Sequence, residues 1–272
     1  MKVLFTKMHG LGNDYIFIDR IKNKYPLLID DKLPKVARYL SKEHFGVASD
    51  GVILIENSNK ADFKMRIFNK DGTEAEMCGN GIRCFAKYIY DNKMTVKNKI
   101  SIETLAGIKK VEFVKNKDGI VEEYKVNMGT PKIEGVLRLN ILNQLFYINR
   151  VSMGNPHSVI FVRNLDRVNI EKYGPLIENN HNFPNKTNVE FVQVLDRNLI
   201  KMRVWERGSK ETYACGTGTC AAVVAGSNQN LTDRKVKVLL RGGELYINWE
   251  EKSNFVFMQG IATKVFDGMI EI

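Results

Sequence analysis

The eighteen residues KMRIFNKDGTEAEMCGNG, from Lys64 to Gly81, occur a second time in altered form as KMRVWERGSKETYACGTG, from Lys201 to Gly218. The offset is a constant 137 residues without a gap, and seven of the eighteen positions are identical. Each copy has the pattern of a β-strand, a turn and a Cys-Gly-x-Gly corner that leads into a helix. The repeat therefore predicts that the chain is a duplication of one structural unit.

The segments around the two copies recur in the same order. MHGLGNDYIFI (8–18) is similar to VSMGNPHSVIFV (151–162), because each has Gly-Asn shortly before an apolar run. Helices are predicted at 34–46, 81–91, 170–180 and 219–230, and strands over most of the remaining apolar segments, up to 255–268. We expect an α+β protein of two domains, 1–123 and 124–263, each a mixed sheet with one helix opened by Cys-Gly, with 264–272 returning to the first domain.

Composition limits the class of protein. The chain has 272 residues, of which 44% are hydrophobic and 26% charged, as in ordinary soluble proteins. It has no apolar run of the roughly 20 residues that span a bilayer, and its first residues lack a secretory signal, so we expect a cytoplasmic protein without a membrane partner. The net charge is +10, but the basic residues are scattered and no nucleic-acid-binding motif accompanies them. We expect no nucleic-acid partner.

The four cysteines are Cys78, Cys84, Cys215 and Cys220. Structural disulfides are unusual in a cytoplasmic chain, so catalysis, metal binding or burial must account for them. Their spacings, C-x5-C and C-x4-C, match no standard zinc motif, and no histidine lies near either pair. We expect no metal, with a four-cysteine zinc site as a weaker alternative, and we expect Cys84 and Cys220 to be packing residues.

The two Cys-Gly corners indicate a reaction when they are considered together. A cysteine at a helix start has its pKa lowered, and the unpaired amide groups there favour an anion such as a carboxylate. Alone, such a corner could hold a nucleophile, a redox thiol or a structural cysteine. Two equivalent thiols on opposite faces of an α-carbon could remove a proton from one face and return one to the other. This predicts epimerisation of an amino acid without a cofactor, with Cys78 and Cys215 as the catalytic pair.

These motifs resemble those of the diaminopimelate epimerase family along the whole chain, from KMHGLGNDY through RIFNKDGTEAEMCGNGIRCFA and SMGNPHSVIF to ERGSKETYACGTGTCAA. The resemblance implies two pseudo-symmetric domains, each a β-barrel-like mixed sheet wrapped around a central helix. It implies conversion of LL-2,6-diaminopimelate to meso-diaminopimelate, a step toward lysine and peptidoglycan, with Cys78 and Cys215 shuttling the proton. We also expect a homodimer, because edges of such sheets often pair.

The resemblance further implies the residues around the cysteines. His157 and Glu206 correspond to the pair that adjusts the protonation of the thiols. The expected substrate-binding residues are Asn13, Asn69, Gly79, Asn80, Asn155, Asn188, Glu206, Arg207, Gly216 and Thr217. Of these, the Gly79–Asn80 and Gly216–Thr217 pairs would offer amide groups to the reacting carboxylate. His9, His44 and His181 receive no role.

Departures from the family pattern leave the substrate open. Ser49 stands where the family usually has Ala or an aromatic residue, and Gly51 where some members have a substrate-binding Gln. Ser209 and Lys210 replace small residues on the loop between Arg207 and Cys215. A racemase or epimerase of a related amino acid, such as lanthionine or histidine, is the alternative. A dehydratase or isomerase on the same fold is disfavoured because both cysteines are present, and a non-enzymatic nucleic-acid-binding or zinc protein is a third hypothesis.

Overall fold

The computed structural model describes residues 1–26 and 28–272. Its backbone contacts divide the chain into two compact units, the first made of Met1–Val126 with Ile261–Ile272 and the second of Asn127–Gly260. These units follow from contacts alone, and the domain limits 1–123, 124–263 and 264–272 stay a prediction. We describe each unit by itself.

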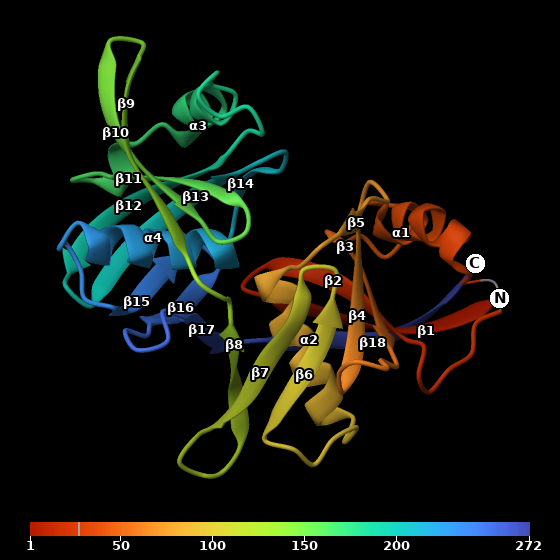
Figure 1. The fold of residues 1–272 in the computed structure, drawn as a ribbon. Helices are drawn as coiled ribbons and strands as arrows, with labels where there is room; N and C mark the ends of the chain where they lie inside the picture. Colours follow the sequence, from red (N-terminus) through yellow and green to blue (C-terminus); the bar gives the residue numbers. More distant parts are fainter. Residues whose placement is uncertain (27) are drawn as a thin grey trace. The chain divides into compact units, whose positions relative to one another are not determined.

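The first unit is a curled mixed sheet with one helix inside it and one outside (Figure 1). Its elements are β1 (Lys2–Gly10), β2 (Asn13–Asp19), η1 (Asp30–Lys32), α1 (Leu33–Ser41), β3 (Gly51–Glu56), β4 (Phe63–Asn69), β5 (Glu74–Ala75), α2 (Gly79–Asp91), β6 (Lys99–Thr104), β7 (Gly107–Lys115), β8 (Val121–Asn127) and β18 (Thr263–Glu271). The strand order is β18-β1-β2-β3-β4-β6-β7-β8, with β5 also beside β4.

The second unit has the same plan. Its elements are β9 (Lys132–Ile141), β10 (Gln144–Ser152), β11 (Pro156–Phe161), η2 (Leu165–Arg167), α3 (Ile170–Glu178), β12 (Asn188–Asp196), β13 (Leu199–Glu206), β14 (Lys210–Thr212), α4 (Gly216–Asn228), β15 (Lys235–Leu240), β16 (Gly243–Trp249) and β17 (Val256–Ile261). Its strand order is β9-β10-β11-β12-β13-β15-β16-β17, with β14 also beside β13.

Parallel pairs stand at the same two places in both sheets. They are β2–β3 and β4–β6 in the first unit, and β11–β12 and β13–β15 in the second. Parallel neighbours need a crossover connection, and each of these four crossovers contains a helix. The matching topology and the matching helices confirm the predicted α+β fold of two pseudo-symmetric halves.

The helices that follow the cysteines lie inside the sheets. α2 packs against β1, β2, β3, β7 and β18, and α4 against β10, β11, β12, β15 and β16. α4 is buried on nearly every face, which its run of small apolar residues, CAAVVAG, allows. α1 packs on β3 and β4, and α3 on β12 and β13, each over an apolar cluster of its own unit.

The last strand belongs to the first unit. β18 pairs antiparallel with β1 from Lys2 to His9, and the two chain ends lie side by side (Figure 1). Ile272 N–H donates to the carbonyl of Met1 at 2.9 Å. This return adds a strand from the far end of the sequence to the edge of the first unit's sheet, where it packs against α2.

One local expectation was wrong, and one element was missed. The helix expected from Pro34, with Gly46 past its end, already ends at Ser41, because Lys42 has an extended backbone and His44, with a left-handed φ of 66°, turns the chain away. Gly46 is required by space, since a Cβ on it would lie 2.3 Å from the carbonyl oxygen of Tyr39. The hairpin of β9 and β10 was not predicted; Leu142 and Asn143 form its turn with φ of 52° and 63°.

Candidate active site

Cys78 is the N-cap of α2, and its sulfur accepts a hydrogen bond from the N–H of Gly81 at 3.3 Å. The helices expected at 81–91 and 219–230 thus begin earlier, at Gly79 and Gly216, so the glycines of both corners lie in the first helical turn. None of these glycines has a positive φ. A Cβ on Gly81 would lie 2.8 Å from Ile53 Cδ1, so the end of the Ile53 side chain would have to shift.

The side chains of Tyr15 and Asn13 contact the sulfur of Cys78, and Asn80 contacts Asn13. The hydroxyl of Tyr15 donates to Sγ at 3.3 Å, and Cys78 in turn can donate to Asn13 Oδ1 at 3.3 Å. Asn80 Nδ2 also donates to Asn13 Oδ1, at 3.4 Å. Burial, and after it the negative charge of Cys78, raises the pKa of the Tyr15 phenol. The phenol therefore remains a hydrogen-bond donor at neutral pH.

A buried arginine, Arg83, holds the side chain of Asn80 by a hydrogen bond. Arg83 is fully buried, and its guanidinium donates to Asn80 Oδ1 at 3.0 Å and to the carbonyl of Gly79 at 3.0 Å. Its Nε donates to the carbonyl of Ile261 at 3.1 Å. This cation sits under the first turn of α2, where it fixes the side chain of an expected binding residue.

Asp50, which the sequence reasoning missed, holds the other end of Asn13. Its Oδ2 accepts from Asn13 Nδ2 at 2.7 Å and from the N–H of Asp14 at 3.0 Å. Burial raises the pKa of Asp50, against the opposing effect of these hydrogen bonds. The neighbouring Ser49 donates to the carbonyl of Gly51 at 2.9 Å and lies 3.0 Å from the hydroxyl of Ser41, so the departure at Ser49 stabilises the loop before β3.

Cys215 is the N-cap of α4 in the same way, and its sulfur accepts from the N–H of Gly218 at 3.4 Å. Cys215 is 6% exposed, and its sulfur lies 3.6 Å from the hydroxyl of Thr217. Burial, then the carboxylates of Glu206 and Glu190, raises the pKa of the Cys215 thiol well above its ordinary value. The helix start favours the thiolate here too, but the two carboxylates and burial oppose it.

A chain of hydrogen bonds leads from the helix start of α4 into the core. Asn155 Nδ2 donates to Thr217 Oγ1 at 3.3 Å, and Asn155 Oδ1 lies 3.1 Å from Nε2 of His157. Nδ1 of His157 lies 2.7 Å from Oε1 of Glu190. His157 and Glu190 are 1% and 0% exposed. The structure therefore joins the expected residues Thr217, Asn155 and His157 to a carboxylate that the sequence reasoning missed.

Glu206, at the end of β13, lies beside the same cysteine, and its carboxylate raises the pKa of the Cys215 thiol. It accepts a hydrogen bond from Thr212 Oγ1. Burial raises the pKa of Glu206, and its interactions with Thr212 and Cys215 oppose the shift. An acid of raised pKa beside a thiol is a suitable proton acceptor or donor for it.

The other expected binding residues lie farther from the sulfur atoms. Asn188, the first residue of β12, pairs with His157 of the neighbouring strand β11. Its side chain donates to the carbonyl of Pro156 at 3.0 Å and accepts from the N–H of Arg207 at 2.9 Å. The exposed guanidinium of Arg207 donates to the carbonyl of Asn185 at 2.9 Å. In the first unit, Asn69 at the end of β4 donates to Thr73 Oγ1 at 3.0 Å. No hydrogen bond of the described chain links Asn69 to Cys78.

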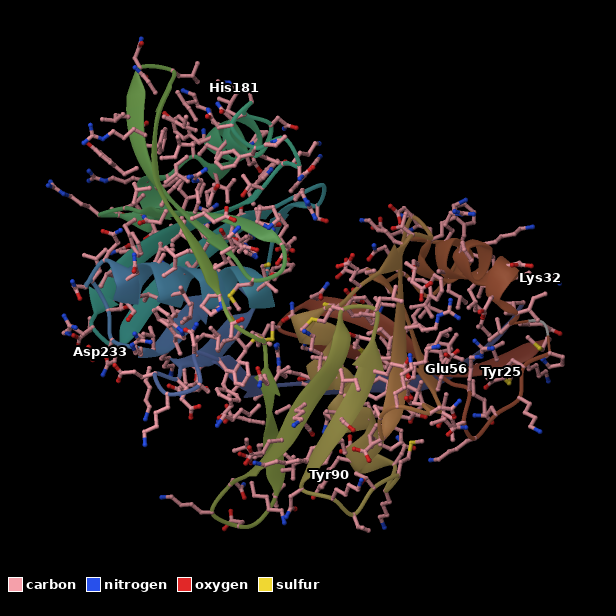
Figure 2. The ribbon with its side chains drawn as sticks, in the orientation of Figure 1. Tyr25, Lys32, Glu56, Tyr90, His181 and Asp233 are labelled. Carbon is pink, nitrogen blue, oxygen red and sulfur yellow. The ribbon has the colours of Figure 1, made fainter. Side chains whose placement is uncertain are left out.

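The remaining candidates are accounted for by their positions. Cys84 and Cys220 are fully buried in their helices, and burial raises the pKa of Cys84 to about 12. His181 lies at the surface after α3 (Figure 2). Lys210 is exposed, has a left-handed φ of 64° and pairs with Glu206 through the backbone.

The described residues offer neither a metal-binding cluster nor a membrane-spanning helix. Across 1–26 and 28–272, no three His, Cys, Asp or Glu side chains gather in a way that could hold a metal ion. In the same part of the chain, every helix is too short or too polar to cross a lipid bilayer.

The two corners match residue by residue, but the residues behind them differ. Asn13 and Asn155 precede Tyr15 and His157 by two positions in equivalent strands, and the facing strands begin at Gly51 and Asn188, which are 137 residues apart. Two residues farther along these strands lie Ile53 and Glu190. The glycine of the first helical turn approaches each of them. A Cβ on Gly218 would lie 2.5 Å from Glu190 Oε1, and a Cβ on Gly81 would lie 2.8 Å from Ile53 Cδ1.

Comparison with known proteins agrees with this geometry. A family model described as diaminopimelate epimerase matches residues 5–134 and 150–265. The diaminopimelate epimerase of Agathobacter rectalis is 49% identical over 98% of this chain and 99% of its own length. That of Methanococcus maripaludis strain C5 is 48% identical over 98% and 99%.

Among solved structures, a PhzF-family phenazine biosynthesis protein of Bacillus anthracis has a TM-score of 0.78 at 18% identity, covering all of both chains, which shows a shared fold. The match to the family model extends over both units, and the relatives share nearly half of their residues with this chain from end to end. The chain belongs to the diaminopimelate epimerase family.

Proposed function

We propose that the protein converts LL-2,6-diaminopimelate to meso-diaminopimelate by a two-base mechanism that uses Cys78 and Cys215 and no pyridoxal phosphate. The observation that carries the proposal is that each cysteine is the N-cap of a helix, in two corners of the same construction. The near 50% identity to proteins named diaminopimelate epimerase supports the substrate.

In the proposed reaction the two sulfur atoms lie on opposite faces of the substrate α-carbon. A thiolate removes the α-proton and becomes a thiol, while the partner thiol gives its proton to the other face and becomes a thiolate. The proton count is unchanged, and the configuration is inverted. The first-turn amide groups, at Gly79–Asn80 and Gly216–Thr217, stabilise the charge that develops on the carboxylate.

The other residues have separate roles in this proposal. Glu206, beside Cys215, and His157, which is linked to Thr217 through Asn155, adjust the protonation of Cys215. The reverse reaction uses the same groups with the roles of the thiols exchanged. The asparagines and Arg207 bind the end of the substrate that does not react, since Arg binds carboxylates bidentately.

Deuterium incorporation tests the reaction. Purified protein in D₂O, with reductant and no added cofactor, should place solvent deuterium at the α-carbon of the product. Cys78→Ala and Cys215→Ala should each lower kcat by at least about 10²–10⁴-fold, the range of general acid–base catalysis. Cys84→Ala and Cys220→Ala, deeper in the same helices, are the matched controls and should remain active. Either catalytic variant retaining inversion within tenfold of the natural rate would contradict the two-base mechanism.

The same assay decides the substrate. The departure at Lys210 left open an epimerase or racemase of a related amino acid, so L-lanthionine and L-histidine are tested beside LL-diaminopimelate. If either has a higher kcat/KM than LL-diaminopimelate, that amino acid becomes the proposed substrate.

We also propose a homodimer in the cytoplasm. β18 is at the end of the strand order of its unit, and Leu4, Phe266 and Met269 on this β1–β18 pair are 52%, 45% and 56% exposed. Pairing at such an edge would cover them. A reducing compartment suits a reaction that needs two free thiols. Light scattering of the purified protein at micromolar concentration checks the dimer, and a monomer mass would contradict it.

A further inference from the structure

The two thiols have different neighbours, although their corners match. Tyr15 in β2 occupies the place that His157 has in β11, two positions after the equivalent asparagine. Ile53 occupies the place of Glu190. The first cysteine thus has a phenol and an aliphatic side chain where the second has an imidazole and a carboxylate.

Two hydrogen-bond donors converge on the sulfur of Cys78. They are the hydroxyl of Tyr15 and the N–H of Gly81, each at 3.3 Å. Tyr15 is 5% exposed, so water competes little for its hydroxyl. Donors directed at a group stabilise its charged form. Asn13 Oδ1, at 3.3 Å, is the acceptor that serves the sulfur when it carries a proton.

The sulfur of Cys215 differs in its charged neighbours. Its hydrogen-bond partners are Gly218 N–H at 3.4 Å and the hydroxyl of Thr217 at 3.6 Å, and the carboxylate of Glu206 raises the pKa of its thiol. Glu190 adds a second carboxylate behind the helix start. Acceptors and negative charge favour the protonated form of a thiol.

We propose that Tyr15 is a positioning residue that acts through Cys78: its hydroxyl holds the sulfur and favours the thiolate, so that the resting enzyme has Cys78 ionised and Cys215 protonated. The inference rests on the proposed function for its catalytic meaning. The difference between the two thiols can be measured without substrate. The raised pKa of the buried phenol supports the proposal, because Tyr15 then donates without losing its own proton.

Alkylation tests the inference on the full chain. The rate of iodoacetamide labelling of each cysteine is measured against pH by peptide mass spectrometry, and the midpoint reports ionisation independently of access. In the natural protein the midpoint of Cys78 should lie below that of Cys215. Tyr15→Phe, which removes the hydroxyl alone, should move the Cys78 midpoint up by about one pH unit. It should move the acid limb of kcat/KM in the same direction.

Tyr88→Phe is the matched control. It removes another buried phenol of the same unit, one that donates to Asp19 Oδ2 at 3.2 Å, and it should leave the Cys78 midpoint in place. A Cys215 midpoint at or below that of Cys78 would overturn the proposal, even if Tyr15→Phe did not fold. An unmoved Cys78 midpoint in Tyr15→Phe, or an equal shift in Tyr88→Phe, would also overturn it. A failure of the proposed two-base function would be recognised by a different result, namely that the Cys78→Ala variant still epimerises the substrate.

Discussion

Glu190 offers a quantitative test of how the second corner is held together. Its side chain is fully buried, Oε1 lies 2.7 Å from His157 Nδ1, and Oε2 has no hydrogen-bond partner among the described residues. Nε2 of the same imidazole faces Asn155 Oδ1 at 3.1 Å. Both ring nitrogens therefore face oxygen atoms, and at Nδ1 the partner is a buried carboxylate.

Two substitutions of Glu190 separate charge from shape. Glu190→Gln keeps the shape and an oxygen that can accept from His157, so a charge-assisted hydrogen bond worth about 1.5–3 kcal/mol becomes a neutral one of about 0.5–1.5 kcal/mol. We expect a loss of roughly 1 kcal/mol in the free energy of unfolding. Glu190→Ala leaves His157 buried without its partner, which typically costs about 3–5 kcal/mol.

Urea unfolding of the full chain measures both losses, and a double-mutant cycle with His157→Ala isolates the pair. The control is Glu244→Gln, which breaks the exposed pair with Lys237 at 2.6 Å and should cost less than about 1 kcal/mol. A coupling energy between Glu190 and His157 below about 0.5 kcal/mol would refute the reasoning. Because the Glu190 carboxylate raises the pKa of the Cys215 thiol, Glu190→Gln should also lower the alkylation midpoint of Cys215.

Three further outcomes are expected. Burial raises the folded-state pKa of Glu206 above 4.5, so its contribution to stability is present below pH 4.5 and is lost as pH rises through that raised value. The unfolding free energy of the natural protein relative to Glu206→Gln should therefore fall above pH 4.5, and a flat difference would contradict this. Cys84 and Cys220 should react with iodoacetamide only after denaturation, as peptide mass spectrometry can check. Gly174→Ala should lower stability by about 1–3 kcal/mol in urea, because its Cβ would lie 2.5 Å from the Trp205 ring, despite better helix propensity.

The fold was predictable where the sequence repeats itself. The constant offset of 137 residues joins β4 to β13 and α2 to α4, so an interpretation of one copy supports the other. The hairpin of β9 and β10 was missed because its counterpart in the first unit is β18 with β1, which come from opposite ends of the chain. No local repeat can indicate such a pair. Its turn, Leu142-Asn143, also lacks the glycine that usually marks a two-residue hairpin loop.

The candidate site could be anticipated only where its residues are duplicated. The cysteines, with Asn13 and Asn155, are marked by duplication, whereas Asp50 and Glu190 are not duplicated. Glu190 has one sequence signal: it is a single charge within NVEFV, where every residue is buried. Alternation along a strand predicts an exposed charge there, and only the closing of the sheet around α4 places Glu190 under the helix start.

The differences between the two corners have a physical reason under the proposed mechanism. A two-base epimerase needs one thiolate and one thiol at the same time, and two identical environments would ionise both thiols or neither over much of the pH range. The helix N-cap, which favours a thiolate, is the same in both units. Opposite protonation states must then come from the residues behind it. At the first corner Tyr15 adds a donor to the sulfur, and the Asp50 carboxylate and the Arg83 cation are reached only through Asn13 and Asn80. At the second corner two carboxylates, Glu190 and Glu206, raise the pKa of the Cys215 thiol itself. Under the proposed mechanism, duplication supplies two equivalent positions for sulfur, and divergence in the strands beneath them supplies the difference in protonation that the first proton transfer requires.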